Sequence, residues 1–291
     1  MRLAPHGRTR RRHRLRDRAG RGRGGRGRGP RRRVGAALSA PAGSVGALVL
    51  VGGRARRFGG AAKPLVELGG STPWERTLVA LRECGVAPVV AAGPGWGDAG
   101  PGEGRAPTGV AATVPVGWVR EDPPFGGPVA AIAAGLPALA GTEWALLLAG
   151  DLVHPADVVR TLCDAVGTLC DAVRTRRDAV RADEAAGVPG ERRTADLGGH
   201  DSADRVDAIV FRAEGRAQWL AGAYRVEAVR AALAAIAEPS AAAARELLGG
   251  LPTRWIPDED GITADIDTPA DLERARAALA DPSAHHDEEP R

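Results

Sequence analysis

The sequence predicts an α/β fold, a three-layer α/β/α sandwich in which helices cover both faces of a mostly parallel sheet. Two observations support this fold class. Short apolar runs alternate with amphipathic segments along most of the 291 residues, which is the order expected of strands joined by helices. Residues 144–149 are continuously apolar, as strands buried on both faces of a parallel sheet are.

The individual elements can be assigned in order from residue 45. The first strand is Val45–Val51. Thr72-Pro-Trp-Glu75 forms a capping box with proline at the first helical position, which opens a helix to about Glu83. Further strands are expected at 86–92, 116–119, 144–149, 206–211 and 253–256, and further helices at 127–139, 226–236 and from 269 to about 280.

Three tandem copies of a seven-residue sequence interrupt this pattern at 161–167, 168–174 and 175–181. Three copies are too few for a coiled coil, and the apolar positions fade in the third. The repeats therefore predict a lengthened surface helix, followed by a polar stretch at 182–205. Together they make a flexible insertion at about 163–205.

Charge divides the chain into an arm and a body. Residues 1–33 contain fifteen arginines and one aspartate, whereas the remainder carries 25 basic and 35 acidic residues. Residues 1–43 have too few apolar side chains to order themselves and are expected to form a disordered arm. Binding of RNA by the arginines is an alternative, but no aromatic side chains are interleaved for base stacking. The expected domain is 44–281, with a polar tail at 282–291.

Targeting signals are not expected. The apolar stretch after Arg31–Arg33 is broken by Pro41 and Gly43, unlike a secretion signal, and no run approaches the ~18 apolar residues of a membrane span. The three cysteines lack the spacing of a metal site and fit reduced thiols. A cytoplasmic protein is expected.

The only lysine of the chain, Lys63, ends a glycine-rich loop that follows the first strand. In such loops backbone N–H groups approach phosphate oxygens while cations neutralise them. Neither the Walker pattern nor the dinucleotide pattern G-x-G-x-x-G is present. The loop, which also carries Arg54, Arg56 and Arg57, suits a triphosphate.

Carboxylates at two places indicate a metal site. Asp151 follows the strand 144–149, where open α/β sheets bind ligands. Mg²⁺ is usually held by one or two carboxylates together with phosphate oxygens and waters. Asp265 and Asp267 precede the last helix, and one of them is expected to complete the site.

Four motifs in this order resemble those of the molybdenum cofactor guanylyltransferases and, more broadly, of the MobA-like nucleotidyltransferases. They are the loop 50–65, Glu121-Asp-Pro-Pro-Phe-Gly-Gly-Pro128, Leu147-Leu-Ala-Gly-Asp151 and Asp265-Ile-Asp-Thr-Pro269. Residues 218–224 also fit the acceptor side of that family. The resemblance covers about 45–280 and implies a Rossmann-like GT-A architecture.

The resemblance also implies a role for each residue. Arg57 and Lys63 would contact the phosphates, Asp122 the nucleoside, and Gly127 would let the base or ribose approach. Asp151 would bind Mg²⁺, helped by Asp265 or Asp267. The implied catalytic residues are Arg57, Lys63 and Asp151, and the implied nucleotide-binding residues are Leu50, Val51, Gly52, Gly53, Lys63, Asp122, Gly127 and Asp151.

The implied reaction is transfer of GMP from GTP to molybdopterin with release of pyrophosphate. Further partners would be molybdoenzyme maturation proteins, and a monomer without membrane or nucleic-acid partners is expected. Ala62 stands where the family usually has aspartate, Phe58 where it has methionine, and Asp267 where it often has asparagine. The alternatives are a CTP-dependent cytidylyltransferase, an enzyme with another phosphate acceptor, and a nucleotide-binding protein without turnover.

Overall fold

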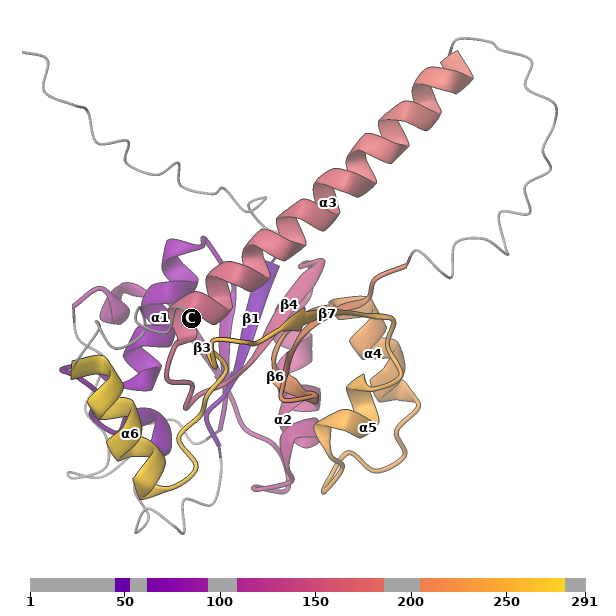
Figure 1. Ribbon diagram of the computed structural model, residues 1–291. Coiled ribbons are helices and arrows are strands. Elements are labelled where there is room, and N and C mark those ends of the chain that lie inside the picture. The colour runs from indigo at the N-terminus through magenta and orange to yellow at the C-terminus, as the bar shows by residue number, and fades with distance from the viewer. Residues whose placement is uncertain (1–44, 53–61, 94–108, 186–204, 281–291) are drawn as a thin grey trace, which may run out of the picture. The chain divides into compact units, whose positions relative to one another are not determined.

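A seven-stranded sheet forms the centre of the fold, in the order β3-β2-β1-β4-β6-β5-β7 (Figure 1). The computed structural model describes residues 45–52, 62–93, 109–185 and 205–280. Strands β3, β2, β1 and β4 are mutually parallel, β6 is antiparallel to both of its neighbours, and β5 pairs with β7 in parallel. The strands are β1 (Val45–Leu50), β2 (Val89–Ala92), β3 (Val116–Val119), β4 (Trp144–Ala149), β5 (Ala208–Ala213), β6 (Arg216–Arg225) and β7 (Thr253–Pro257).

Helices cover both faces of the sheet, and Figure 1 shows α1 on one side of it and α4 and α5 on the other. Helices α1 and α3 pack in one core with one set of strand residues, and α2, α4 and α5 pack in a second core with the other set. The three-layer, mostly parallel α/β fold predicted from the sequence is therefore confirmed. The helices are α1 (Pro73–Glu83), α2 (Pro128–Gly135), α3 (Pro155–Ala185), α4 (Val226–Ala234), α5 (Ala244–Leu248) and α6 (Pro269–Ala280), with short 3-10 turns η2 (Lys63–Leu65), η3 (Ala111–Thr113) and η4 (Leu136–Leu139).

The side chains of β4 show why a continuously apolar strand is needed at the centre. Leu146 and Leu148 point into the core shared with α1 and α3, and Leu147 points into the core of the opposite face. All three are fully buried. Because successive residues of a strand face opposite sides, every position of a strand covered on both faces must be apolar.

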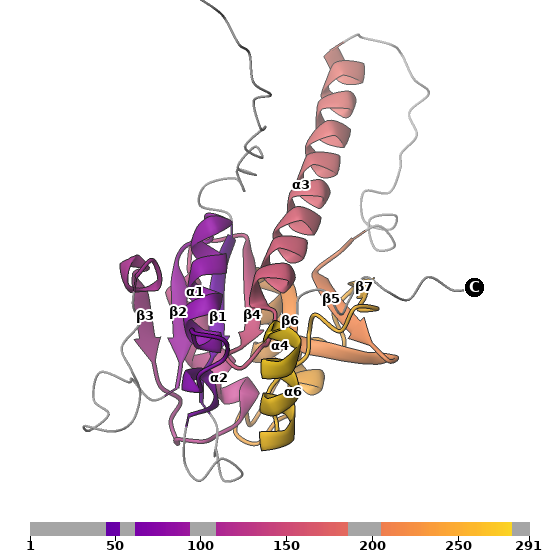
Figure 2. The ribbon, with the colours of Figure 1, turned by 60° about the vertical axis from the view of Figure 1, so that its left-hand side comes forward.

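Helix α3 contains the tandem repeats. Leu162 and Val166, in the first copy, are buried against the core, whereas the residues from Asp171 onward that the structure describes are exposed. The helix extends away from the sheet beyond that point (Figures 1 and 2). The repeats at 161–181 are thus helical, as predicted, and the helix continues through 182–185, which the sequence analysis had assigned to the polar stretch. Residues 186–204, the arm and the tail lie outside the described residues.

Two elements depart from the sequence prediction. Strand β2 begins at Val89 rather than at residue 86 because Pro88 has no N–H for the ladder. Strand β6 was not predicted, since its small residues show no alternation of polar and apolar positions.

The capping box of α1 is confirmed: Thr72 Oγ1 accepts from the Glu75 N–H at 3.1 Å, and the Glu75 carboxylate accepts from the Thr72 N–H at 3.0 Å. Among the described residues, none of the helices combines the length and apolarity that a bilayer crossing requires.

Candidate functional site

Lys63 lies in a cluster of charged side chains at the carboxyl edge of the sheet. It begins η2, where Pro64 fixes the backbone of the first turn. Its Nζ donates a hydrogen bond to Asp267 Oδ1 at 2.7 Å and lies 3.6 Å from Asp151 Oδ2. The structure thus brings together three of the residues that the sequence singled out.

Backbone contacts near the end of β4 bring Asp151 and the two later aspartates together. Asp151 follows β4 by two residues, and the segment that precedes α6 pairs with the chain at this point through a bridge between Leu152 and Asp265. The Ile266 N–H donates to the Asp151 carbonyl at 3.2 Å. Asp265 and Asp267 are therefore held beside Asp151 although more than a hundred residues separate them in the sequence.

A glycine lets η2 approach the strand ends. A side chain on Gly150 would bring its Cβ within 2.9 Å of Val51 Cγ1 and 3.1 Å of Pro64 Cγ. The first distance is shorter than real Cβ contacts show and the second is tight, so glycine is what lets η2 pack this closely against the ends of β1 and β4. This contact places Lys63 next to the two strands that carry the predicted nucleotide-binding and metal-binding residues.

Burial and mutual repulsion perturb the carboxyl groups. Burial raises the pKa of Asp151, although the charge of Lys63 opposes the shift. Burial, together with the negative charges of Asp267 and Asp151, raises the pKa of Asp265 to about 6. For Lys63, burial lowers the pKa, but the hydrogen bond to Asp267 and the nearby carboxylates outweigh it, so that the pKa is raised. The cluster contains more negative than positive side chains and therefore favours a further cation.

The donor set fits Mg²⁺ in its chemistry, because carboxylate oxygens are the ligands this hard cation prefers. Among the residues that the structure describes, no three acidic, histidine or cysteine side chains are arranged as a ready metal cage. Mg²⁺ seldom uses such an all-protein cage and relies on phosphate oxygens and water for its remaining ligands. Binding of a metal by Asp151, Asp265 and Asp267 stays a prediction.

The nucleotide-binding residues predicted near β1 lie at the same edge. Leu50 ends β1, Val51 is buried, and the N–H groups of Val51 and Gly52 both donate to the Ala92 carbonyl, at 3.0 and 3.2 Å. Gly52 itself is exposed. Gly53 and Arg57 lie outside the described residues, as do Arg54 and Arg56.

The motif after β3 supplies two more of the predicted residues. Asp122 is exposed, and Gly127 is the N-cap of α2 with φ of 91°, a conformation that glycine adopts without strain. The neighbouring Glu121 begins the same motif, but the sequence analysis gave it no role because a single glutamate carries no spacing signal of its own. Its side chain is buried next to Gly52.

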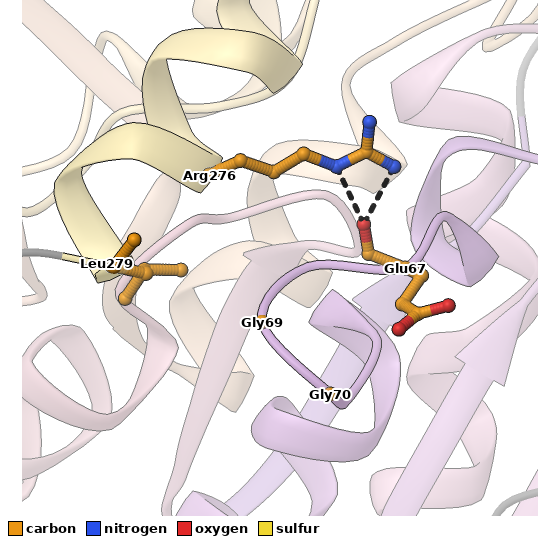
Figure 3. Close-up of a pocket in the computed structure, with 6 residues that line it drawn as sticks. Glu67, Gly69, Gly70, Arg276 and Leu279 are labelled. Carbon is orange, nitrogen blue, oxygen red and sulfur yellow. Dashed lines mark hydrogen bonds between the residues drawn. The ribbon is translucent and has the colours of Figure 1, made fainter.

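A shallow hollow elsewhere on the surface contains none of the predicted site residues. It lies between the turn at Gly69 and Gly70 and the end of α6 (Figure 3). Arg276 crosses it and donates two hydrogen bonds to the Glu67 carbonyl, at 3.2 and 3.1 Å. The guanidinium thus holds α6 to the turn, which gives the hollow a structural explanation.

The family model described as "MobA-like NTP transferase domain" matches residues 47–255, well over half of the chain. The chain belongs to the MobA-like NTP transferase family. This confirms the resemblance seen in the sequence, and the matched range includes Lys63 and Asp151 but ends before Asp265. No curated protein sequence matches the chain.

Solved structures match this MobA-like chain at low sequence identity, and the first two named here share its fold. The Rv0371c homologue of Mycobacterium sp. strain JC1 is 20% identical, with 81% of this chain and 96% of that chain covered and a TM-score of 0.52. A nucleotidyl transferase of Methanothermobacter thermautotrophicus is 19% identical, with 81% and 98% covered and a TM-score of 0.51. Molybdopterin-guanine dinucleotide biosynthesis protein A of Archaeoglobus fulgidus is 20% identical, with 80% and 98% covered and a TM-score of 0.48.

Proposed function

We propose that the protein transfers GMP from GTP to the terminal phosphate of molybdopterin and releases pyrophosphate. The observation that carries this proposal is the contact of Lys63 with Asp151 and Asp267 at the carboxyl edge of the sheet, in a MobA-like chain. Open α/β sheets bind ligands at this edge, and phosphoryl chemistry needs chiefly charge neutralisation and positioning there.

Each residue has a defined task in this mechanism. Lys63 would place its ammonium on the phosphates of GTP, and Asp151 with Asp265 or Asp267 would hold Mg²⁺. Bound Mg²⁺ would neutralise charge on the phosphate oxygens. Attack by the acceptor phosphate on the α-phosphate forms one P–O bond, breaks another, and leaves the electron pair and the negative charge on pyrophosphate.

The absence of an aspartate at position 62 does not leave Lys63 unsupported. Ala62 offers no side-chain hydrogen bond to η2, but Asp267 reaches Lys63 from a distant segment at 2.7 Å. A carboxylate thus orients the lysine, although it comes from another part of the chain. This arrangement favours turnover over the alternative of a protein that only binds nucleotide.

The test measures the Mg²⁺-dependent release of pyrophosphate from GTP when molybdopterin is supplied as the acceptor. Asp151→Asn keeps the size of the side chain but removes its charge, so we expect release to fall at least about a hundredfold. A matched control is Asp157→Asn, because Asp157 is exposed on α3 and pairs only with Arg160 among the interactions described. Equal loss in both variants would contradict the proposed role of Asp151.

A further inference from the structure

Glu121 is a buried carboxylate at the edge where three parallel strands end. It follows β3 by two residues, and only 8% of its surface is exposed. Its Oε1 accepts a hydrogen bond from the Phe125 N–H at 3.1 Å, which supports the turn after β3. The same oxygen lies 3.7 Å from where a Cβ on Gly52 would stand.

The second oxygen of Glu121 is not accounted for by the described part of the chain. Oε2 is buried and has no hydrogen-bond partner there. A buried polar atom without a partner destabilises the folded chain, and a charged group does so more strongly. A ligand or a bound water can supply the missing donor, so Oε2 indicates a site for a hydrogen-bond donor.

The surroundings of Glu121 suit a flat ligand that approaches the backbone closely. A Cβ on Gly93 would lie 2.7 Å from the Gly52 nitrogen, so only glycine lets the chain after β2 pack this closely on the chain after β1. Gly52 is exposed and has no side chain beside Glu121, which leaves room for a ligand there. The phosphate-binding cluster proposed around Lys63 lies at the neighbouring edge of β1 and β4. Glu121 follows β3, two strands away from β1 in the sheet, so the base of a nucleotide whose phosphates lie on Lys63 can reach it across the ends of β1 and β2.

We propose that Glu121 selects the base of the nucleotide and that it selects guanine; this rests on the proposed nucleotidyl transfer. A carboxylate accepts hydrogen bonds and donates none. Guanine presents two adjacent donors, N1–H and the N2 amino group, whereas adenine and cytosine present one amino group beside an unprotonated ring nitrogen that repels a carboxylate. Glu121 therefore favours GTP over ATP and CTP and acts as a specificity-determining residue.

The test measures equilibrium binding of GTP, ITP, XTP, ATP and CTP to the full chain in Mg²⁺. ITP lacks the N2 amino group, and XTP carries a carbonyl oxygen in its place. Wild-type protein should bind GTP at least about tenfold more tightly than ITP, since a hydrogen bond to a charged group is lost. Equal affinity for GTP and ITP would overturn the inference without any variant.

The variant Glu121→Gln sharpens the test, because glutamine keeps one oxygen for the Phe125 N–H and replaces the other with a donor. GTP binding should weaken by about ten- to a hundredfold, and the preference for GTP over XTP should narrow or reverse. Turnover at saturating GTP should change little. The control Glu83→Gln, at an exposed position near the end of α1, should behave as wild type.

The outcomes separate this inference from the proposed function. If Glu121→Gln weakens all five nucleotides equally, or none, Glu121 does not select the base, while nucleotidyl transfer stands. If CTP binds best to wild type, transfer again stands and the guanine assignment is wrong. If no triphosphate binds at all, the proposed function is wrong and the inference is lost with it.

Discussion

Replacing Lys63 should impair catalysis much more than folding. The Nζ atom lies 2.7 Å from Asp267 and 3.6 Å from Asp151, whose side chains are 61% and 17% exposed. Water screens the pair with Asp267, so Lys63→Met should lower the free energy of unfolding by only about 1–2 kcal/mol. Loss of one cation that neutralises charge in the transition state should lower kcat by about 10²–10³-fold.

The assay combines urea unfolding with Mg²⁺-dependent pyrophosphate release, both on the full chain. Lys63→Arg is the informative companion, because it keeps the charge but replaces a compact ammonium with a planar fork. We expect its stability to stay close to wild type and its turnover to fall at least about tenfold. Near wild-type turnover of Lys63→Arg would refute the argument for Lys63. So would a loss of turnover in either variant that is explained by its unfolded fraction in the urea experiment.

Three further predictions follow from particular residues. Gly135→Ala would place a Cβ inside the side chain of the fully buried Leu48 and should lower the free energy of unfolding in urea by about 1–3 kcal/mol. Gly167→Ala, in open space on α3, should raise it by about 0.5–1 kcal/mol. The reverse order of stability would contradict the packing described for these two glycines. Because the pKa of Asp265 is raised to about 6 from 3.8, Mg²⁺ affinity measured by calorimetry should fall as pH falls through about 6, and a flat profile would remove Asp265 from the metal site. Without metal, the free energy of unfolding should fall as pH rises from about 4 to about 6, because the folded chain then holds a proton on Asp265 that the unfolded chain has lost. Deletion of residues 1–33 should leave pyrophosphate release unchanged, and a collapse would show that the arm takes part.

The sequence was sufficient for the fold class and for the order of the motifs. Strand β4 is continuously apolar, the capping box marks the start of α1, and Asp151 stands at a strand end, so each feature has a local signal. Nothing in the sequence around Lys63 or around Asp267 indicates that the two side chains are in contact. Their contact depends on the bridge between Leu152 and Asp265, which only the folded chain brings together.

Other features were missed for related physical reasons. Strand β6 is rich in small residues and lacks alternation, because it is covered on both faces by neighbours that leave little room. Gly222 illustrates this, since a Cβ there would lie 2.8 Å from the Tyr224 ring. Glu121 was missed because its significance lies in its burial and in the lack of a hydrogen-bond partner for Oε2 among the described residues, neither of which a sequence pattern records.

The most direct test of the account measures pyrophosphate release by the full chain with Mg²⁺ and molybdopterin as the acceptor, and compares GTP, CTP and ATP. The account predicts release that requires GTP, acceptor and Mg²⁺ together, that stops when the metal is chelated, and that is strongly reduced in Asp151→Asn. Release with no preference for GTP over CTP and ATP would contradict the guanylyltransferase assignment, and no release with any nucleotide would contradict nucleotidyl transfer itself.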